Sequence, residues 1–195
     1  MSETAKKEKK KIDLGPKIAS YPMPVCLIGA NLGSKANFLT AAWFMSASIS
    51  PPRIAVALNK GHSTNKGIKE HAAFSVSIPS EDLITATDYC GLFSGSKTDK
   101  SAVFDIFYGK LGTAPMIIEC PVNMECKLEK VVDNGEHEMF IGEIVSTFTE
   151  EKYLTNRAVD LKKVKPFLLS FYDRQYLGIG ESKARAWSVG NSYKR

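Results

Sequence analysis

Histidine and cysteine are both scarce in this sequence, with three histidines and four cysteines among 195 residues. The cysteines form no CxxC pair and no zinc-binding pattern with histidine; they are Cys26, Cys90, Cys120 and Cys126. We therefore expect no metal site. Free thiols of this kind are typical of a reducing cytoplasm.

Long apolar runs are absent as well. No stretch approaches the roughly 20 apolar residues that a helix needs to cross a bilayer. No apolar region follows the lysines near the N-terminus, as it would in a secretory signal. The sequence therefore predicts a cytoplasmic protein without membrane contact, and its 44% hydrophobic residues suffice for a packed core.

Excess charge is small and unevenly placed. The net charge is +5, and residues 1–13 hold five lysines against Glu3, Glu8 and Asp13. We expect a flexible basic tail over residues 1–17 and one domain over residues 18–195. No basic stripe alternates with aromatic residues, so we expect no nucleic-acid partner.

Sequence motifs for self-contained catalysis are also lacking. No GxGxxG follows the first apolar run, which argues against a nicotinamide-binding Rossmann domain. No GxSxG elbow occurs, and no cysteine and histidine form a recognisable nucleophilic pair. A function without its own catalytic group favours a bound cofactor that supplies the chemistry.

The elements that the sequence does contain are mainly strands. Alternating or continuous apolar runs predict strands at 24–30, 38–50 (one long, bent strand), 53–58, 74–78, 123–131 and 138–148, with a strand and loop over 167–181. In the strand at 123–131, Asn123 and Glu125 belong to the polar, exposed face. Asn-Gly within 132–137 predicts a hairpin turn. Short helices follow Ser63 and span about 81–91. This pattern indicates a mainly β protein with short helices, built as a barrel.

Three segments could bind a ligand. The turn at 60–64 precedes a helix, so its free N–H groups, Ser63, Thr64 and Lys60 could hold a phosphate; an ordinary N-cap explains the same residues. The small residues of 40–50 could face a flat aromatic ligand, or they could simply let the strand bend. The loop 94–100 could bind an anion or be solvated.

Taken in order along the chain, these motifs resemble the flavin reductase-like family with its FMN-binding split barrel, and its flavoredoxin branch in particular. The resemblance rests on "YPMPVCLIGA", "ANFLTAAWFMSASISPPRIAVAL", "KGHSTNKGIKEHAAFSVSIPSED", "SGSKTDK" and "CKLEKVVDNGEHEMFIGEIV". It covers about residues 18–190. It implies a split β-barrel that forms a homodimer and binds FMN near the subunit interface.

The resemblance also implies roles for particular residues. The isoalloxazine would be lined by Asn37, Thr40, Ala41, Ala42, Trp43, Ser48 and Ser50. The ribityl phosphate would be met by Asn59, Lys60, His62, Ser63, Thr64, Gly95, Lys97 and Lys100, with Cys90 just before the loop. His137, in the stretch "GxHxxFxGE", would stand where an electron donor approaches the flavin; alternatively, it is a turn histidine at the start of a strand.

The implied function is to pass electrons from NAD(P)H or a redox protein through FMN to a flavin, a ferric complex or a protein acceptor. Two alternatives share the same fold. One is a flavoredoxin-like electron carrier without NAD(P)H activity of its own. The other is a protein that holds FMN without redox turnover.

Overall fold

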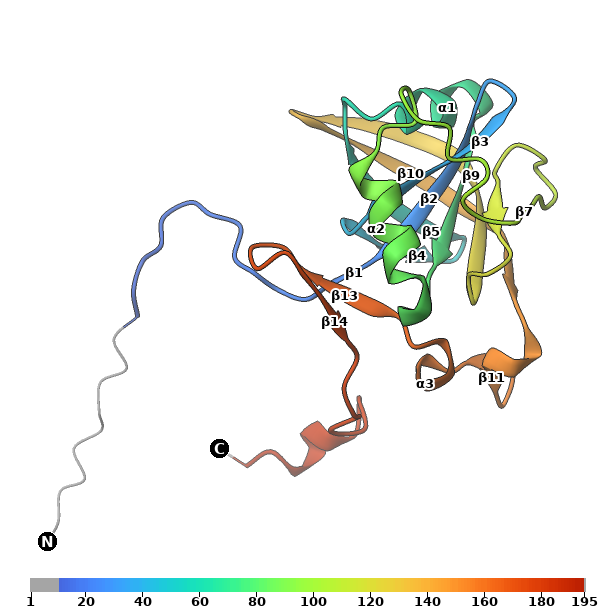
Figure 1. The fold of residues 1–195 in the computed structure, drawn as a ribbon. Helices are drawn as coiled ribbons and strands as arrows, with labels where there is room; N and C mark the ends of the chain where they lie inside the picture. Colours follow the sequence, from blue (N-terminus) through green and yellow to red (C-terminus); the bar gives the residue numbers. More distant parts are fainter. Residues whose placement is uncertain (1–10, 195) are drawn as a thin grey trace, which may run out of the picture.

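A curved antiparallel sheet of seven strands dominates the computed structural model, which describes residues 11–194 (Figure 1). Its strand order is β3-β2-β6-β9-β10-β5-β4. In chain order these strands are β2 (Cys26–Leu32), β3 (Lys35–Ala41), β4 (Phe44–Ile49), β5 (Pro52–Asn59), β6 (Ala73–Ile78), β9 (Val122–Asn134) and β10 (His137–Thr149). The prediction of a mainly β protein is confirmed.

The predicted single strand over 38–50 is wrong. The segment forms two strands, β3 and β4, which lie at opposite edges of the sheet: β3 pairs with β2, and β4 pairs with β5. Only Ala42 and Trp43 connect the two edges. So short a connection requires the sheet to curl until its edges approach each other, as in a split barrel.

The interior of the curled sheet is one apolar core. It holds alternate residues of the strands, among them Ile28, Val56, Phe74 and Phe140, all fully buried. Helix α1 (Thr64–His71) contributes Ile68 to the same core. The backbone of α1 lies so close to β2 that a Cβ on Gly67 would come within 2.1 Å of the Asn31 carbonyl oxygen. The start of α1 is therefore fixed relative to the sheet.

A second core covers the outer face of β2 and β3. Helix α2 (Ile84–Leu92), which follows the 3-10 turn η1 (Glu81–Leu83), packs there, as Figure 1 shows. Cys90 of α2 meets Leu27, Phe38 and Phe104 in this core. The predicted helix at 81–91 is thus confirmed, with a 3-10 first turn.

The predicted exposed face of the strand at 123–131 is wrong in its first half. Asn123 and Glu125 are buried because the segment carrying β7 (Ile106–Phe107) and β8 (Met116–Ile117) covers them. Glu125 accepts hydrogen bonds from the backbone N–H groups of Lys110 and Leu111, both at 2.9 Å. Polar residues in this half of β9 therefore organise a loop rather than face solvent.

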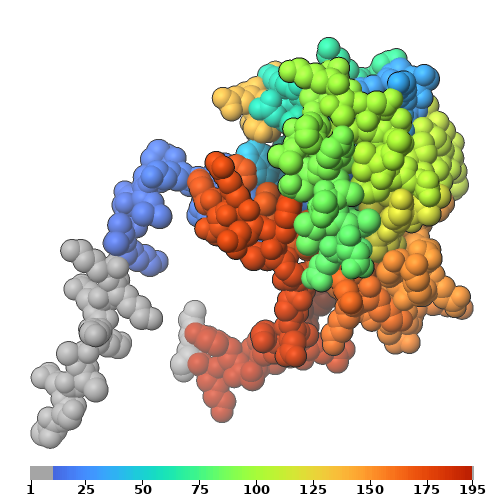
Figure 2. All heavy atoms as spheres, viewed as in Figure 1, coloured from blue at the N-terminus to red at the C-terminus, as the bar shows by residue number. Residues whose placement is uncertain are grey.

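The remaining elements form a smaller, peripheral part. A three-stranded sheet has the order β1-β13-β14. Its strands are β1 (Met23–Pro24), β13 (Phe167–Ser170) and β14 (Gln175–Gly178), while β11 (Leu154–Thr155), β12 (Ala158–Val159), α3 (Leu161–Val164) and the turns η2 (Glu151–Tyr153) and η3 (Val189–Ser192) complete the chain. Both ends of the described chain extend away from the body (Figure 2).

Of the predicted tail, residues 1–10 lie outside the described residues, and residues 11–17 are exposed. Across residues 11–194, no helix combines the length and the apolar character that crossing a membrane requires. All four cysteines are free and buried.

The close approach of α1 to β2 gives a test of the fold. Gly67→Ala should lower the free energy of unfolding by about 1–3 kcal/mol, because the added methyl group meets a backbone carbonyl that cannot move freely. In an uncrowded helix the same change would be stabilising by about 1 kcal/mol. Urea unfolding measures the difference. Gly190→Ala, where a Cβ meets nothing within 4 Å, is the matched control. A stabilised Gly67→Ala protein would contradict this packing.

Candidate functional site

The turn between β5 and α1 carries most of the predicted phosphate residues. Asn59 ends β5, and its side-chain Oδ1 accepts a hydrogen bond from the Gly61 N–H at 2.9 Å. The Asn59 carbonyl accepts from the His62 N–H at 3.1 Å and from the Asn65 side chain at 3.1 Å. Asn59 therefore shapes the turn that presents His62, Ser63 and Thr64.

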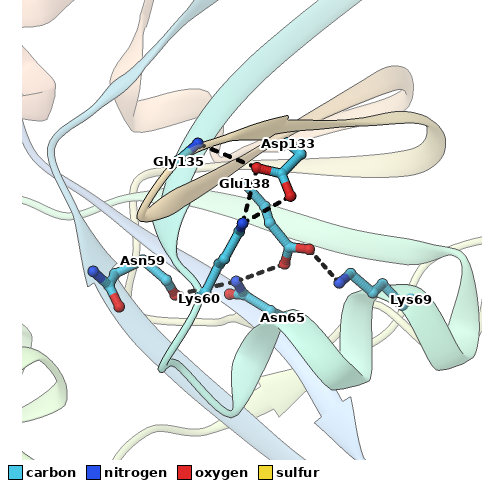
Figure 3. A network of polar contacts seen from close by, with 7 residues as sticks. All are labelled: Asn59, Lys60, Asn65, Lys69, Asp133, Gly135 and Glu138. Carbon is cyan, nitrogen blue, oxygen red and sulfur yellow. Dashed lines mark hydrogen bonds and ion pairs between the residues drawn. The ribbon is translucent and has the colours of Figure 1, made fainter.

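A network of ion pairs holds this turn against the β9–β10 hairpin (Figure 3). The Lys60 ammonium contacts both carboxylate oxygens of Asp133, at 2.8 and 2.7 Å. Glu138 accepts from the Lys69 ammonium at 2.5 Å and from the Asn65 amide at 3.2 Å. The hydrogen bond from Lys69 is the main cause that lowers the pKa of Glu138. Lys60, predicted to meet the phosphate, is thus bound to a carboxylate in this structure.

The start of α1 opens into a small cavity of about 140 Å³. Its walls are His62, Ser63 and Thr64, Leu39 of β3, residues 91–95 at the end of α2 and just beyond it, and Lys100. Ser63 is the N-cap residue, yet its hydroxyl makes no capping hydrogen bond, and the first turn of α1 carries no acidic residue. Two of the first N–H groups of α1, those of Asn65 and Lys66, donate to the His62 and Ser63 carbonyls at 3.3 and 3.0 Å. The helix start therefore offers the cavity the Thr64 N–H and the partial positive charge of the helix dipole. The cavity therefore suits an anion.

Lys100 brings a buried positive charge to the same cavity. Only 2% of Lys100 is exposed, and its Nζ donates to the carbonyls of Cys90 and Phe93, both at 3.1 Å. These carbonyls lie at the C-terminal end of α2, where the helix dipole favours a cation. An ammonium has three hydrogens to donate, and within residues 11–194 no carboxylate forms an ion pair with this one. Burial lowers the pKa of Lys100. An anion in the cavity would supply the missing partner.

Asn37 adds a buried acceptor next to these donors. It is 3% exposed, and its Nδ2 donates to Thr64 Oγ1 at 2.9 Å. Its Oδ1 is buried without a partner among the described residues. Asn37 also lines a neighbouring cavity of about 260 Å³, together with Gly95, Lys97 and Lys100. A ligand with a donor group, such as a hydroxyl, would satisfy this buried acceptor.

Gly95 lets the loop close over both cavities. A Cβ at this position would come within 2.0 Å of Asn37 Oδ1 and within 3.1 Å of Ser63 Oγ. The predicted loop 94–100 and the predicted turn 60–64 are therefore brought together, with Lys100 and Gly95 belonging to both cavities. Lys97 lines only the larger of the two.

His62 lies within this positive surrounding. Partial desolvation is the main cause that lowers its pKa from the ordinary value of 6.5, although the residue as a whole remains exposed, and the charges of Lys100 and His137 lower it further. His62 is thus held in its neutral form before an anion binds. The Lys100 ammonium makes the electrostatic potential of the site positive.

Three other predicted residues, Ala42, Trp43 and His137, lie in a separate apolar and aromatic region. Trp43 lies over His137 with ring centroids 4.8 Å apart, and its other neighbour is Phe171 at 6.3 Å. Ala42 and Trp43 line an apolar pocket of about 480 Å³. The His62 pKa responds to His137, so the aromatic cluster and the anion cavity are electrostatic neighbours.

Three residues that were predicted to bind the cofactor instead stabilise the fold or lie in its core. The Thr40 hydroxyl donates to the Thr87 carbonyl and ties β3 to α2. Ala41 is part of the barrel core. Cys90 is buried, and burial raises the pKa of its thiol to about 11; its carbonyl, rather than its sulfur, serves the site by holding Lys100.

Ser48 and Ser50 are not brought to the cavity within one chain. Ser48 pairs with Arg53, at the far end of the β4–β5 hairpin from Asn59. Asn59 lies six positions after Arg53 along the extended strand, which is about 20 Å. They could serve the same ligand only if it is elongated or if a second subunit contributes.

Some residues of the site had no signal in the sequence. Leu39 and residues 91–94 line the cavity because α2 ends there, and the Asp133 and Glu138 carboxylates matter only through pairing of distant strands. Gly91 and Gly95 flank the end of α2, and this spacing of glycines around a helix terminus was the available clue.

The chain is similar to several known proteins along most of its length. Residues 18–180 match the profile described as the flavin reductase like domain. The structure is similar to a flavoredoxin from Methanosarcina acetivorans, with 42% identity, a TM-score of 0.92, and coverage of 94% of this chain and 98% of that one. It is also similar to the flavoredoxin of Desulfovibrio vulgaris (Miyazaki F), with 35% identity, a TM-score of 0.84, and coverage of 93% and 100%. A ferric-chelate reductase (NAD(P)H) of Archaeoglobus fulgidus is 36% identical over 65% of this chain and 74% of its own length.

The neutral state of His62 gives a test by pH. Because its folded-state pKa lies below that of the unfolded chain, His62 contributes stability above about pH 6.5, and this contribution is lost as the pH falls and the unfolded chain takes up the proton. The wild type should therefore lose stability relative to His62→Gln between about pH 7.5 and pH 5. Urea unfolding at each pH measures the difference. A His62→Gln difference that grows in the opposite direction would contradict the assignment.

Proposed function

The chain belongs to the flavin reductase-like family, and we propose that it is an oxidoreductase that binds FMN and passes electrons through it. The donor would be NAD(P)H or a redox protein, and the acceptor a flavin, a ferric complex or a protein. The family supports a flavin-related redox function. The observation that carries the choice of ligand is Lys100, a buried ammonium without a carboxylate partner among the described residues, beside the open start of α1.

The residues present fit FMN on chemical grounds. A phosphate needs donors and positive charge, which Lys100, the Ser63 hydroxyl and the Thr64 N–H at the start of α1 would provide. A ribityl chain carries hydroxyl donors, and the buried Asn37 Oδ1 would accept from one of them. When FMN is bound, its flavin supplies the redox chemistry, which no side chain of this protein provides.

The chain's own residues would bind and orient FMN and would cover its phosphate. Gly95 lets the loop 94–100 cover the phosphate, and the Lys60–Asp133 and Lys69–Glu138 pairs keep the β5–α1 turn in place. Trp43 and His137 would border the flavin, where an electron donor would approach. An anion beside Lys100 would offset the charge repulsion that adds to desolvation in lowering the pKa of His62.

A homodimer is part of this proposal. The edge strand β4 exposes Met45 and Ile49, with 63% and 93% of their surfaces accessible. An apolar edge strand left open invites pairing or coverage by another chain. A second subunit over β4 would also bring its own residues toward Ser48, Ser50 and the apolar pocket beside Trp43.

A second candidate function is an electron carrier without NAD(P)H activity of its own. The similarity to two flavoredoxins over nearly the whole chain favours it. Both candidates use the same FMN site, and they differ only in whether a nicotinamide can deliver a hydride directly.

The role of Lys100 can be measured by flavin titration. Lys100→Met should weaken FMN binding roughly tenfold to hundredfold, because it removes a charged hydrogen bond to the phosphate. Riboflavin, which lacks the phosphate, should bind the wild type and Lys100→Met with similar affinity. Lys97→Met, at the rim, should have a smaller effect on FMN. Equal losses for riboflavin and FMN would mean that Lys100 does not bind the phosphate, and an absence of flavin affinity in the wild type would overturn the proposed function.

The two candidate functions are separated by anaerobic stopped-flow spectroscopy. We expect NADH or NADPH to bleach the oxidised flavin band with saturation. His137→Ala should slow this step roughly tenfold with FMN affinity retained, because the donor loses a group that orients it. His71→Ala is the control. If neither nucleotide bleaches the flavin while dithionite does, the chain is a carrier and the enzyme proposal fails.

A further inference from the structure

The C-terminal segment 179–194 carries large apolar side chains that are mostly exposed to solvent. Trp187 is fully exposed, and Val189 and Tyr193 are 57% and 79% exposed. The segment follows β14 and stands off from the body of the molecule (Figures 1 and 2). A tryptophan offers about 150–250 Å² of surface for burial, so leaving one fully in water is unfavourable.

The backbone of Trp187 indicates that the segment has a defined shape. Its φ angle is +53°, a left-handed conformation that bulky residues rarely adopt. The 3-10 turn η3 follows directly, and the Val189 N–H donates to the Arg185 carbonyl at 3.1 Å across Trp187. Such a conformation persists when surrounding contacts hold it. Within residues 11–194 of one chain, no other element packs on Trp187.

An apolar pocket without an occupant lies beside the flavin site. It measures about 480 Å³, which is ample for an indole ring. Met45 of β4, Met139 of β10, Ala57 of β5 and Trp43 line it, together with β1 and with Ile18 and Tyr21 of the preceding segment, which are each 54% exposed. Trp43, which lines this pocket, also packs against the His137 ring. Its lining includes no charged side chain.

We propose that Trp187 of a second copy of this chain occupies the apolar pocket, so that each subunit completes the flavin site of the other. One chain carries both halves of the contact, the exposed Trp187 and the empty pocket. A two-fold dimer therefore makes the contact twice. The exposed strand β4, which supplies Met45 to the pocket, continues the same surface toward Ile49. This inference rests on the homodimer of the proposed function and names the residue that the second subunit contributes.

The consequence for the site is exclusion of water. With Trp187 in place, Trp43 and His137 would be covered on the side that faces the pocket. A donor would then reach the flavin only along the rim between the two subunits. In a single subunit this side of Trp43 is open, so the site is incomplete without the partner.

Cross-linking tests which chain supplies the occupant. One chain carries Met45→Cys and a second, differently tagged chain carries Ser188→Cys; the two are co-expressed and treated with a short bismaleimide. The native cysteines are buried and add little background. We expect a cross-linked product that carries both tags. Val159→Cys, on the exposed strand β12, replaces Met45→Cys as the control and should give severalfold less product.

Fluorescence gives an independent reading. The chain has two tryptophans, so Trp187 is the sole one in a Trp43→Phe variant. In the flavin-free dimer, Trp187 emission should be blue-shifted and its quenching by iodide severalfold weaker than after unfolding. Met45→Glu should reverse both effects, because a charge would enter the apolar pocket.

Three results would overturn the inference. They are a cross-link that forms only when both cysteines are on one chain, a Trp187 that stays freely quenched in a protein that light scattering shows to be dimeric, and a monomer by light scattering at micromolar concentration. FMN titration of the same proteins separates the two proposals. FMN binding with an exposed Trp187 overturns only this inference, whereas a buried Trp187 without flavin affinity overturns only the proposed function.

Discussion

The Lys100 ammonium is buried between the end of one helix and the start of another, and its only described partners are two carbonyl oxygens. Burying a charge is costly unless it is fully paired. The surrounding structure reduces this cost on one side only, where α2 ends. On the other side lie the open start of α1, the Ser63 hydroxyl and the neutral His62. An anion at this point would balance the local charge.

The fold brings Lys100, Ser63 and the start of α1 to one cavity. The two-residue connection of β3 to β4 curls the sheet, so that β3 and the β5–α1 turn face each other across the cavity. Helix α2 packs on the outside of β3, and its last turn delivers the loop 94–100. The carboxylates of the β9–β10 hairpin fix the turn from the opposite side, which leaves Lys60 paired and Lys100 available.

Much of this arrangement could be predicted from the sequence, and the reasons for the rest are physical. The strands 53–58 and 74–78, the Asn-Gly hairpin and the helix after Ser63 follow from local patterns. The break at Ala42–Trp43 could not be read locally, because small apolar residues suit a bend as well as a change of sheet edge. Burial of Asn123 and Glu125 depends on a distant covering segment. Lys100 was expected near the phosphate, but its burial against the α2 carbonyls is a tertiary feature.

The central claim is that the start of α1 and Lys100 hold the phosphate of FMN. A crystal structure of the protein with FMN tests it most directly. The account predicts a phosphate oxygen within hydrogen-bonding distance of Lys100 Nζ and of Ser63 Oγ, roughly 2.7–3.2 Å from each. A phosphate bound elsewhere, with Lys100 still bonded only to the Cys90 and Phe93 carbonyls, would contradict it.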